Sequence, residues 1–106
     1  MIRGVSARYL NVLDFTLGIA MWVDFTTVRG KVVDYVIVLL LSGADGVKTI
    51  RVYDSAHGFN EMHRYTRSRG KQDGTKFHSG TLGEGLRTAI EEIEGGYDQM
   101  IEGWKG

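Results

Sequence analysis

Two histidines, a carboxylate and several arginines lie in one short stretch of the chain, residues 53–71, with the sequence YDSAHGFNEMHRYTRSRGK. His57 and His63 are two of the three histidines in the protein, and Asp54 precedes them. An imidazole exchanges protons near neutral pH, and a neighbouring carboxylate can orient it, so these residue types are suited to general acid–base catalysis. We predict that His57 and His63 form an acid–base pair and that Asp54 orients one of the two imidazoles.

Basic and aromatic residues follow the second histidine. We predict that Arg64 and Arg67 bind phosphate, and that Arg69, Lys71 and Tyr65 complete a substrate-binding set. Cationic side chains can hold a phosphate backbone while an aromatic ring stacks on a base. The segment therefore predicts a protein that binds or cleaves RNA, in which one group deprotonates the ribose 2′-hydroxyl and another protonates the leaving oxygen.

The same residues allow three other interpretations. In a purely structural one, Asp54 caps a turn, His57 bonds to the backbone and His63 lies on an exposed strand. In another, a metal is bound by Asp54, His57, His63 and, as an optional fourth ligand, His78. Their spacing matches no established ligand pattern, so we expect no metal and no cofactor. In the third, the protein is a non-enzymatic homodimeric interaction module and its histidines are structural.

The composition is that of one small folded domain. The chain has 106 residues, of which 42% are hydrophobic and 25% charged, so we predict a single domain over residues 1–106. The net charge is zero, but residues 48–78 hold seven of the thirteen Lys and Arg, whereas residues 79–106 hold two Lys or Arg and six acids. Electrostatic binding to RNA would depend on this uneven distribution, because the protein as a whole carries no net field.

Several classes of function lack their sequence signatures. The absence of cysteine excludes thiolate nucleophiles and cysteine-based zinc sites. The glycine-containing stretch GTLGEG, residues 80–85, has neither the lysine of a P-loop nor the spacing of a dinucleotide-binding motif. The apolar run from Tyr35 to Leu41 is far too short to cross a bilayer. We therefore expect a cytoplasmic protein with no membrane partner.

The chain has no proline, so its turns should be set by glycine and the residues beside it. These turns divide most of the chain into strands. Asp-Gly pairs are strong hairpin signals, and Arg29-Gly30 is a further plausible turn. The predicted strands cover roughly Leu17–Thr27, Val32–Leu41, Val47–Tyr53, Met62–Arg67 and Thr75–His78, with Asp45-Gly46 and Asp73-Gly74 as the last two hairpin turns. The result is an antiparallel meander of about five strands.

A single helix is predicted after the strands. Thr81 and Glu84 match a capping box, and apolar residues recur at helical spacing from Leu82 to Trp104. This helix should pack on the sheet, and Gly95-Gly96 could bend it. The fold class is therefore α+β. The strand VIVLLL, residues 36–41, is apolar on both faces, so we expect its second face to be covered by the N-terminal segment or by a partner subunit of a homodimer.

The motif V-x-Y-D-x-x-H-G at Val52–Gly58, with His63-Arg64 and a helix starting near Thr81, resembles small prokaryotic proteins that include TumE-like toxins. The resemblance covers roughly residues 30–104. It implies a short antiparallel sheet before a C-terminal helix, a growth-inhibiting activity and an antitoxin protein as partner. Members usually carry a tighter His-x-His cluster, whereas this chain has Tyr65 at the second position after His63.

Overall fold

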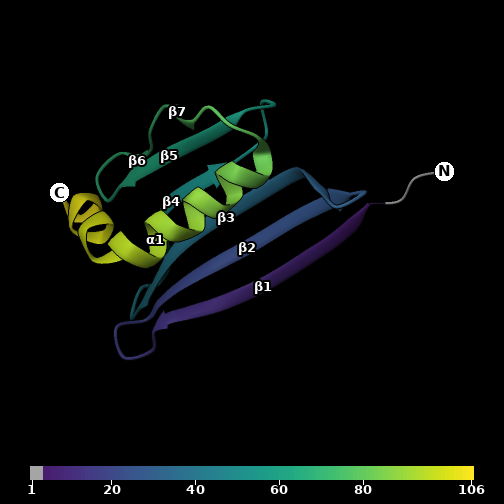
Figure 1. The fold of residues 1–106 in the computed structure, drawn as a ribbon. Helices are drawn as coiled ribbons and strands as arrows, with labels where there is room; N and C mark the ends of the chain where they lie inside the picture. Colours follow the sequence, from purple (N-terminus) through teal and green to yellow (C-terminus); the bar gives the residue numbers. More distant parts are fainter. Residues whose placement is uncertain (1–3) are drawn as a thin grey trace.

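The computed structural model describes residues 4–106, which form an antiparallel sheet and one long helix (Figure 1). Strands β1 to β5 follow one another in the sheet in the order of the sequence, and the short strands β6 and β7 both pair with β5. The predicted α+β class is confirmed, with more strands than the five expected. The elements are β1 (Val5–Asp14), β2 (Ile19–Val28), β3 (Lys31–Gly43), β4 (Gly46–Asp54), β5 (Asn60–Thr66), β6 (Gly70–Lys71), β7 (Thr75–His78) and α1 (Leu82–Lys105).

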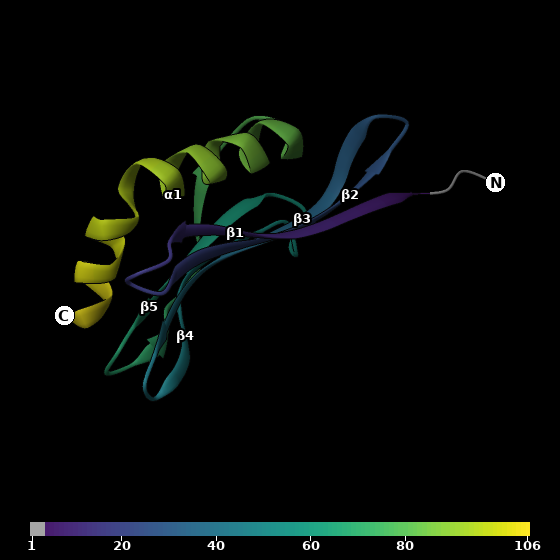
Figure 2. The same ribbon diagram turned by 90° about the horizontal axis from the view of Figure 1, so that it is seen from below.

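The hydrophobic core lies between the helix and one face of the sheet, and Figure 2 shows α1 lying along that face. Alternate residues of β2 and β3 point toward the helix, as the two-residue period of a strand requires. On the helix, Ala89 and Ile93 are fully buried. The buried hydrophobic strand residues are Ile19, Met21 and Val23 in β2, Tyr35, Ile37 and Leu39 in β3, Ile50 and Tyr53 in β4, and Met62 in β5.

The opposite face of the sheet carries no second layer within residues 4–106 (Figure 2). The expectation that the N-terminal segment covers it is wrong, because residues 5–14 instead pair with β2 and become the edge strand β1. Leu10 lies beside Trp22 in this pairing and stays 55% exposed. A partner subunit as the cover stays a prediction.

Two of the three predicted turns are confirmed and one is wrong. Arg29 and Gly30 both have positive φ, at 53° and 77°, which suits the tight turn between β2 and β3. Gly43 pairs with Gly46 around Asp45, as predicted. The hairpin after β5, however, turns at residues 67–69 rather than at Asp73-Gly74. Thr66 Oγ1 accepts a hydrogen bond from the Arg69 amide, and Gly70 has a φ of 72°, so this turn has its own side-chain cap and its own left-handed glycine.

The capping box of the helix is confirmed. The Thr81 hydroxyl accepts a hydrogen bond from the Glu84 amide at 3.2 Å, and the Glu84 carboxylate accepts one from the Thr81 amide at 2.8 Å. Figure 2 shows the helix bending between its green first half and its yellow C-terminal turns. Gly95 and Gly96 lie within α1. Glycine is a poor helix former, which makes this pair the natural place for a bend.

Candidate functional site

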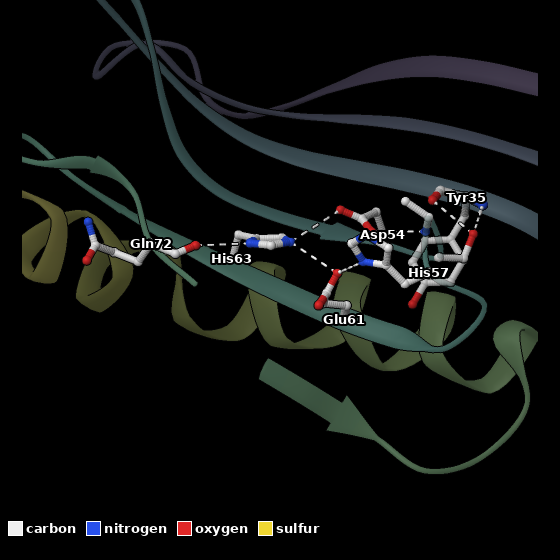
Figure 3. A network of polar contacts seen from close by, with 8 residues as sticks. Tyr35, Asp54, His57, Glu61, His63 and Gln72 are labelled. Atoms are coloured by element: carbon white, nitrogen blue, oxygen red, sulfur yellow. Dashed lines mark hydrogen bonds and ion pairs between the residues drawn. The ribbon is translucent and has the colours of Figure 1, made fainter. Parts of the chain in front are cut away.

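Glu61 is the residue that brings the two predicted catalytic histidines together. Its Oε1 atom lies 2.8 Å from His57 Nδ1 and 3.2 Å from His63 Nε2 (Figure 3). Asp54 is the residue paired with Glu61 across β4 and β5, so a fourth polar side chain joins the group. We call Asp54, His57, Glu61 and His63 the polar cluster.

The polar cluster lies on the face of the sheet opposite the helix. Tyr53 and its cross-strand partner Met62 point into the core beneath α1. Successive residues of a strand point to opposite faces, so Asp54 and Glu61, one position away, point to the other face. Although this face is otherwise open, Glu61 and His63 are each only 8% exposed.

A glycine allows the edge of the sheet to pack against the cluster. A Cβ atom at Gly74 would overlap the Glu61 carboxylate and the His63 ring, so only glycine fits there without displacing them. Gly74 belongs to the break between β6 and β7, and Gln72 in the same break places its carbonyl oxygen 3.0 Å from His63 Nδ1. The irregular edge is therefore part of the site.

His57 is the accessible imidazole of the cluster. Its side chain is 67% exposed, and it sits in the loop between β4 and β5, where Gly58 adopts a φ of 85°. Its Nδ1–H donates to Glu61, and within residues 4–106 its Nε2 makes no hydrogen bond. The Phe59 ring stacks loosely beside it, with 6.3 Å between ring centroids. An imidazole whose Nδ1 is bonded to a carboxylate and whose Nε2 is open to solvent has the arrangement of a general base.

His63 has a different environment. A carbonyl oxygen only accepts hydrogen bonds, so Nδ1 must carry the proton that is donated to Gln72. The other nitrogen, Nε2, faces Glu61 Oε1 and Asp54 Oδ2, the latter at 3.9 Å. Both nitrogens are thus directed at protein atoms, and His63 is better placed to hold Glu61 than to meet a substrate.

Asp54 combines two of the roles considered from the sequence. Its Oδ1 accepts a hydrogen bond from the Ala56 amide at 3.0 Å, which caps the turn into the loop. Its Oδ2 faces His63. It therefore lies beside one imidazole, although Glu61 makes the closer contacts with both.

The hydrogen bonds from His57 and His63 hold the pKa of the Glu61 carboxyl below its usual range. The contact with His57 is the largest cause, and the burial of Glu61 works in the opposite direction. Glu61 is therefore ionised at neutral pH, and its carboxylate accepts hydrogen bonds from both imidazoles.

Three residues of the site were not predicted from the sequence, namely Glu61, Gln72 and Gly74. Glu61 could have been found from the alternation of β5, because it lies two residues before His63 and therefore on the same face. The contributions of Gln72 and Gly74 depend on the break between β6 and β7, which has no comparable signature in the sequence.

The predicted substrate-binding residues do not gather around the polar cluster. His57 precedes β5 and residues 67–69 follow it, so a strand of about 20 Å separates them. The Arg67 guanidinium donates to the Lys105 carbonyl and lies over the Trp104 ring, 5.9 Å from its centroid. This arginine fastens the hairpin to the end of the helix.

The remaining members of that set are also distant from His57. Arg64 pairs with Arg51 and, by alternation, points to the helix side of the sheet. Tyr65 and Lys71 pair with each other at the far end of the hairpin, and Arg69 lies in its turn. A basic side chain nearer the cluster is Lys76, which pairs with Glu61 across the sheet edge.

His78, the optional fourth metal ligand, is not in the cluster. It lies beside Gly80, at the entrance to the helix. The adjoining buried residue Asn60 donates to the carbonyl oxygens of Gly80 and Thr81, both at 3.1 Å, and its Oδ1 accepts from the Tyr35 hydroxyl at 2.7 Å. Asn60 thus ties the start of β5 to the start of α1.

Comparison with known proteins gives a family but no activity. Among residues 4–106, no helix combines the length and apolar character needed to cross a membrane. Searches of curated proteins and of solved structures return no significant match. The model of a domain of unknown function, DUF7718, matches residues 5–105, so the chain belongs to the DUF7718 family.

Proposed function

We propose that this protein is a toxin-like enzyme that binds and cleaves RNA in the cytoplasm, with His57 as its general base. The observation that carries the proposal is the 2.8 Å contact between His57 Nδ1 and the buried Glu61 carboxylate, with the rest of the imidazole exposed. An exposed imidazole backed by an ionised carboxylate is a recurring general-base arrangement. The resemblance to TumE-like toxins supports a growth-inhibiting activity and an antitoxin as partner.

In the proposed reaction, His57 Nε2 accepts the proton of a ribose 2′-hydroxyl. The 2′-oxygen attacks the adjacent phosphorus, and the 5′-oxygen leaves with a proton from solvent or from the protonated His57. Glu61 stabilises the imidazolium that forms, in the way a buried carboxylate does in a catalytic triad. His63, held by Gln72, is a positioning residue that keeps Glu61 aligned.

Groups beside His57 could hold the nucleic acid. The Phe59 ring is 37% exposed and lies next to the His57 ring, where it could stack on a base. Lys76 adjoins Glu61 and could contact a phosphate. Binding of this kind weakens with salt, so affinity for a short single-stranded RNA should fall steeply between low and physiological ionic strength.

Growth after induction and cleavage of RNA by the purified protein test the proposal together. We expect wild type and His78→Ala to arrest growth and cleave RNA, and His57→Ala to do neither while keeping its fold by circular dichroism. A general base contributes about 10²–10⁴-fold in rate, so the loss in His57→Ala should reach at least that range. Equal growth of cells expressing wild type and His57→Ala would refute the enzymatic role.

A second candidate is a homodimeric interaction module, and the uncovered edge strand favours it. Leu10 and Val12 of β1 are 55% and 53% exposed, and within residues 4–106 the one strand that pairs with β1 is β2. An exposed apolar edge strand is a ready template for pairing with another chain. Light scattering after gel filtration would show a dimer for wild type and a monomer for Leu10→Lys. A monomeric wild type would exclude this candidate.

A further inference from the structure

Three members of the polar cluster converge on one point. Asp54, Glu61 and His63 each direct one ligand-type atom at the others, and these three atoms lie within 4.8 Å of one another. The side chains are only 10–13% exposed, so bulk water cannot fully solvate them. These three residues suggest a second role besides RNA cleavage, because the proposed cleavage uses the solvent-exposed nitrogen of His57.

The distances suit a bound ion. Two ligand atoms that are each about 2.0–2.1 Å from a tetrahedral zinc ion lie about 3.4 Å apart. His63 Nε2 is 3.2 Å from Glu61 Oε1 and 3.9 Å from Asp54 Oδ2, values on either side of that separation. The atoms of Asp54 and Glu61 lie within 4.8 Å of each other, so side-chain rotations would bring all three atoms to bonding distance of one ion.

The orientation of His63 is that of a metal ligand. Nδ1 must donate its proton to the Gln72 carbonyl oxygen, so Nε2 is the nitrogen that faces the two carboxylates, where it can carry a proton or bind a metal ion through its lone pair. A lone pair facing carboxylate oxygens requires a positive species between them, either a second proton or a cation. Histidine ligands usually donate their other N–H to a backbone carbonyl or a carboxylate in this way.

The charge of the cluster also suits a bound cation. The ion pairs of Asp54 and Glu61 within residues 4–106 involve only His57 and His63, with no lysine or arginine. Two largely buried carboxylates that form no such pair with lysine or arginine in this part of the chain suit a bound cation, because unbalanced negative charge is costly in a poorly solvated site.

We propose that Asp54, Glu61 and His63 bind one divalent transition-metal ion. A mixed imidazole and carboxylate set suits zinc or manganese better than magnesium or calcium, which prefer oxygen ligands alone. Among these ions zinc should bind most tightly, following the usual order of divalent affinities. His57 donates to the ligand Glu61 from outside, so its Nε2 stays free.

Titration calorimetry of the full chain with zinc chloride, after removal of metals by chelator, tests the site. We expect one equivalent of zinc per chain for wild type and for His78→Gln, which removes a histidine outside the cluster. Asp54→Asn and Glu61→Gln should each weaken binding at least tenfold, since loss of even an outer-shell partner costs about 10–100-fold. Asparagine keeps the oxygen that accepts from the Ala56 amide, so Asp54→Asn should retain its fold.

The outcomes separate this site from adventitious binding and from the proposed enzyme. Visible absorption of bound cobalt in wild type, lost in Asp54→Asn, would support a defined coordination sphere. No zinc binding by wild type, or equal affinity in wild type and Asp54→Asn, would overturn the proposal. An equal loss in His78→Gln would also overturn it. Because the readout is binding, the result holds whether or not the protein cleaves RNA.

Discussion

The hydrogen bond between Tyr35 and Asn60 offers a direct test of what stabilises the start of β5, the strand that carries Glu61 and His63. Tyr35 is 2% exposed and Asn60 is 1% exposed. The Asn60 amide nitrogen faces three carbonyl oxygens, so its Oδ1 must be the atom that accepts from the Tyr35 hydroxyl. Burial raises the pKa of Tyr35, which keeps this hydroxyl protonated as a donor at every pH of interest.

Tyr35→Phe removes one oxygen atom and leaves the Asn60 Oδ1 buried without a donor. An unsatisfied buried acceptor costs about 1–3 kcal/mol, so we expect the free energy of unfolding to fall by about 2 kcal/mol. In a domain of this size, 2 kcal/mol corresponds to a decrease in Tm of about 8–16 °C. Asn60→Ala should cost more, because it also removes the hydrogen bonds that Asn60 donates to the carbonyls of Gly80 and Thr81.

Thermal and urea unfolding, followed by circular dichroism, measure the effect. Tyr9→Phe is the matched control, because Tyr9 is 43% exposed and its change should stay within about 0.5 kcal/mol. The double variant Tyr35→Phe/Asn60→Ala should be less destabilised than the sum of the two single variants. If Tyr35→Phe were as stable as Tyr9→Phe, the argument that Asn60 depends on this donor would be refuted.

Three further predictions concern the edge of the sheet, the helix start and the loop. Gly74→Ala should lower the free energy of unfolding by about 1–3 kcal/mol through overpacking, whereas Gly43→Ala, which has open space, should change it little in urea unfolding. The pKa of Glu84 is lowered by the capping hydrogen bonds with Thr81, so its contribution to stability is present above the unfolded pKa and is lost as pH falls through the folded pKa. Glu84→Gln should flatten the acid side of a Tm–pH curve, and Glu94→Gln should not. Phe59→Ala should weaken RNA binding by about 1–3 kcal/mol in fluorescence anisotropy without changing Tm, if the proposed function holds.

Local signals predicted most of the fold. Asp45-Gly46 and Arg29-Gly30 encode their turns directly, because glycine accepts the positive φ that each turn needs. Thr81 and Glu84 likewise define the helix start through hydrogen bonds only three residues apart. The strand β1 was not predicted, because residues 5–14 have no sharp turn signal before them and mix exposed apolar residues with polar ones.

The turn at Asp73-Gly74 shows where local signals fail. The Asp-Gly pair is a good hairpin sequence, but residues 66–70 satisfy the turn first, with a threonine side-chain cap and a left-handed glycine. Gly74 is needed for another reason, because its lack of a side chain leaves room for Glu61 and His63. Its role depends on the three-dimensional packing of the edge, which no short window of sequence reveals.

The candidate site was only partly predictable from the sequence, because part of it depends on three-dimensional packing. Asp54, His57 and His63 were chosen by residue type, and a hairpin brings their backbones together. Glu61 does not stand out in the sequence, because it is a single acid in a mostly basic segment. In the structure, however, its Oε1 atom contacts both imidazoles. Arg67 was chosen for its charge, but its guanidinium packs on Trp104 at the end of the helix.

Asn60 and Glu61 are neighbours in β5, and their contrast separates stability from function. Asn60 points to the helix side, where every polar atom of its side chain has a protein partner of the right kind. Glu61 points to the open side, where its partners are imidazoles that must carry protons or yield to a cation. A buried polar side chain whose hydrogen bonds are all made by the protein, such as Asn60, stabilises the fold. A buried carboxylate whose partner is a proton or a cation, such as Glu61, is suited to exchange that proton or cation. The chemistry of this protein should therefore be sought on the helix-free face.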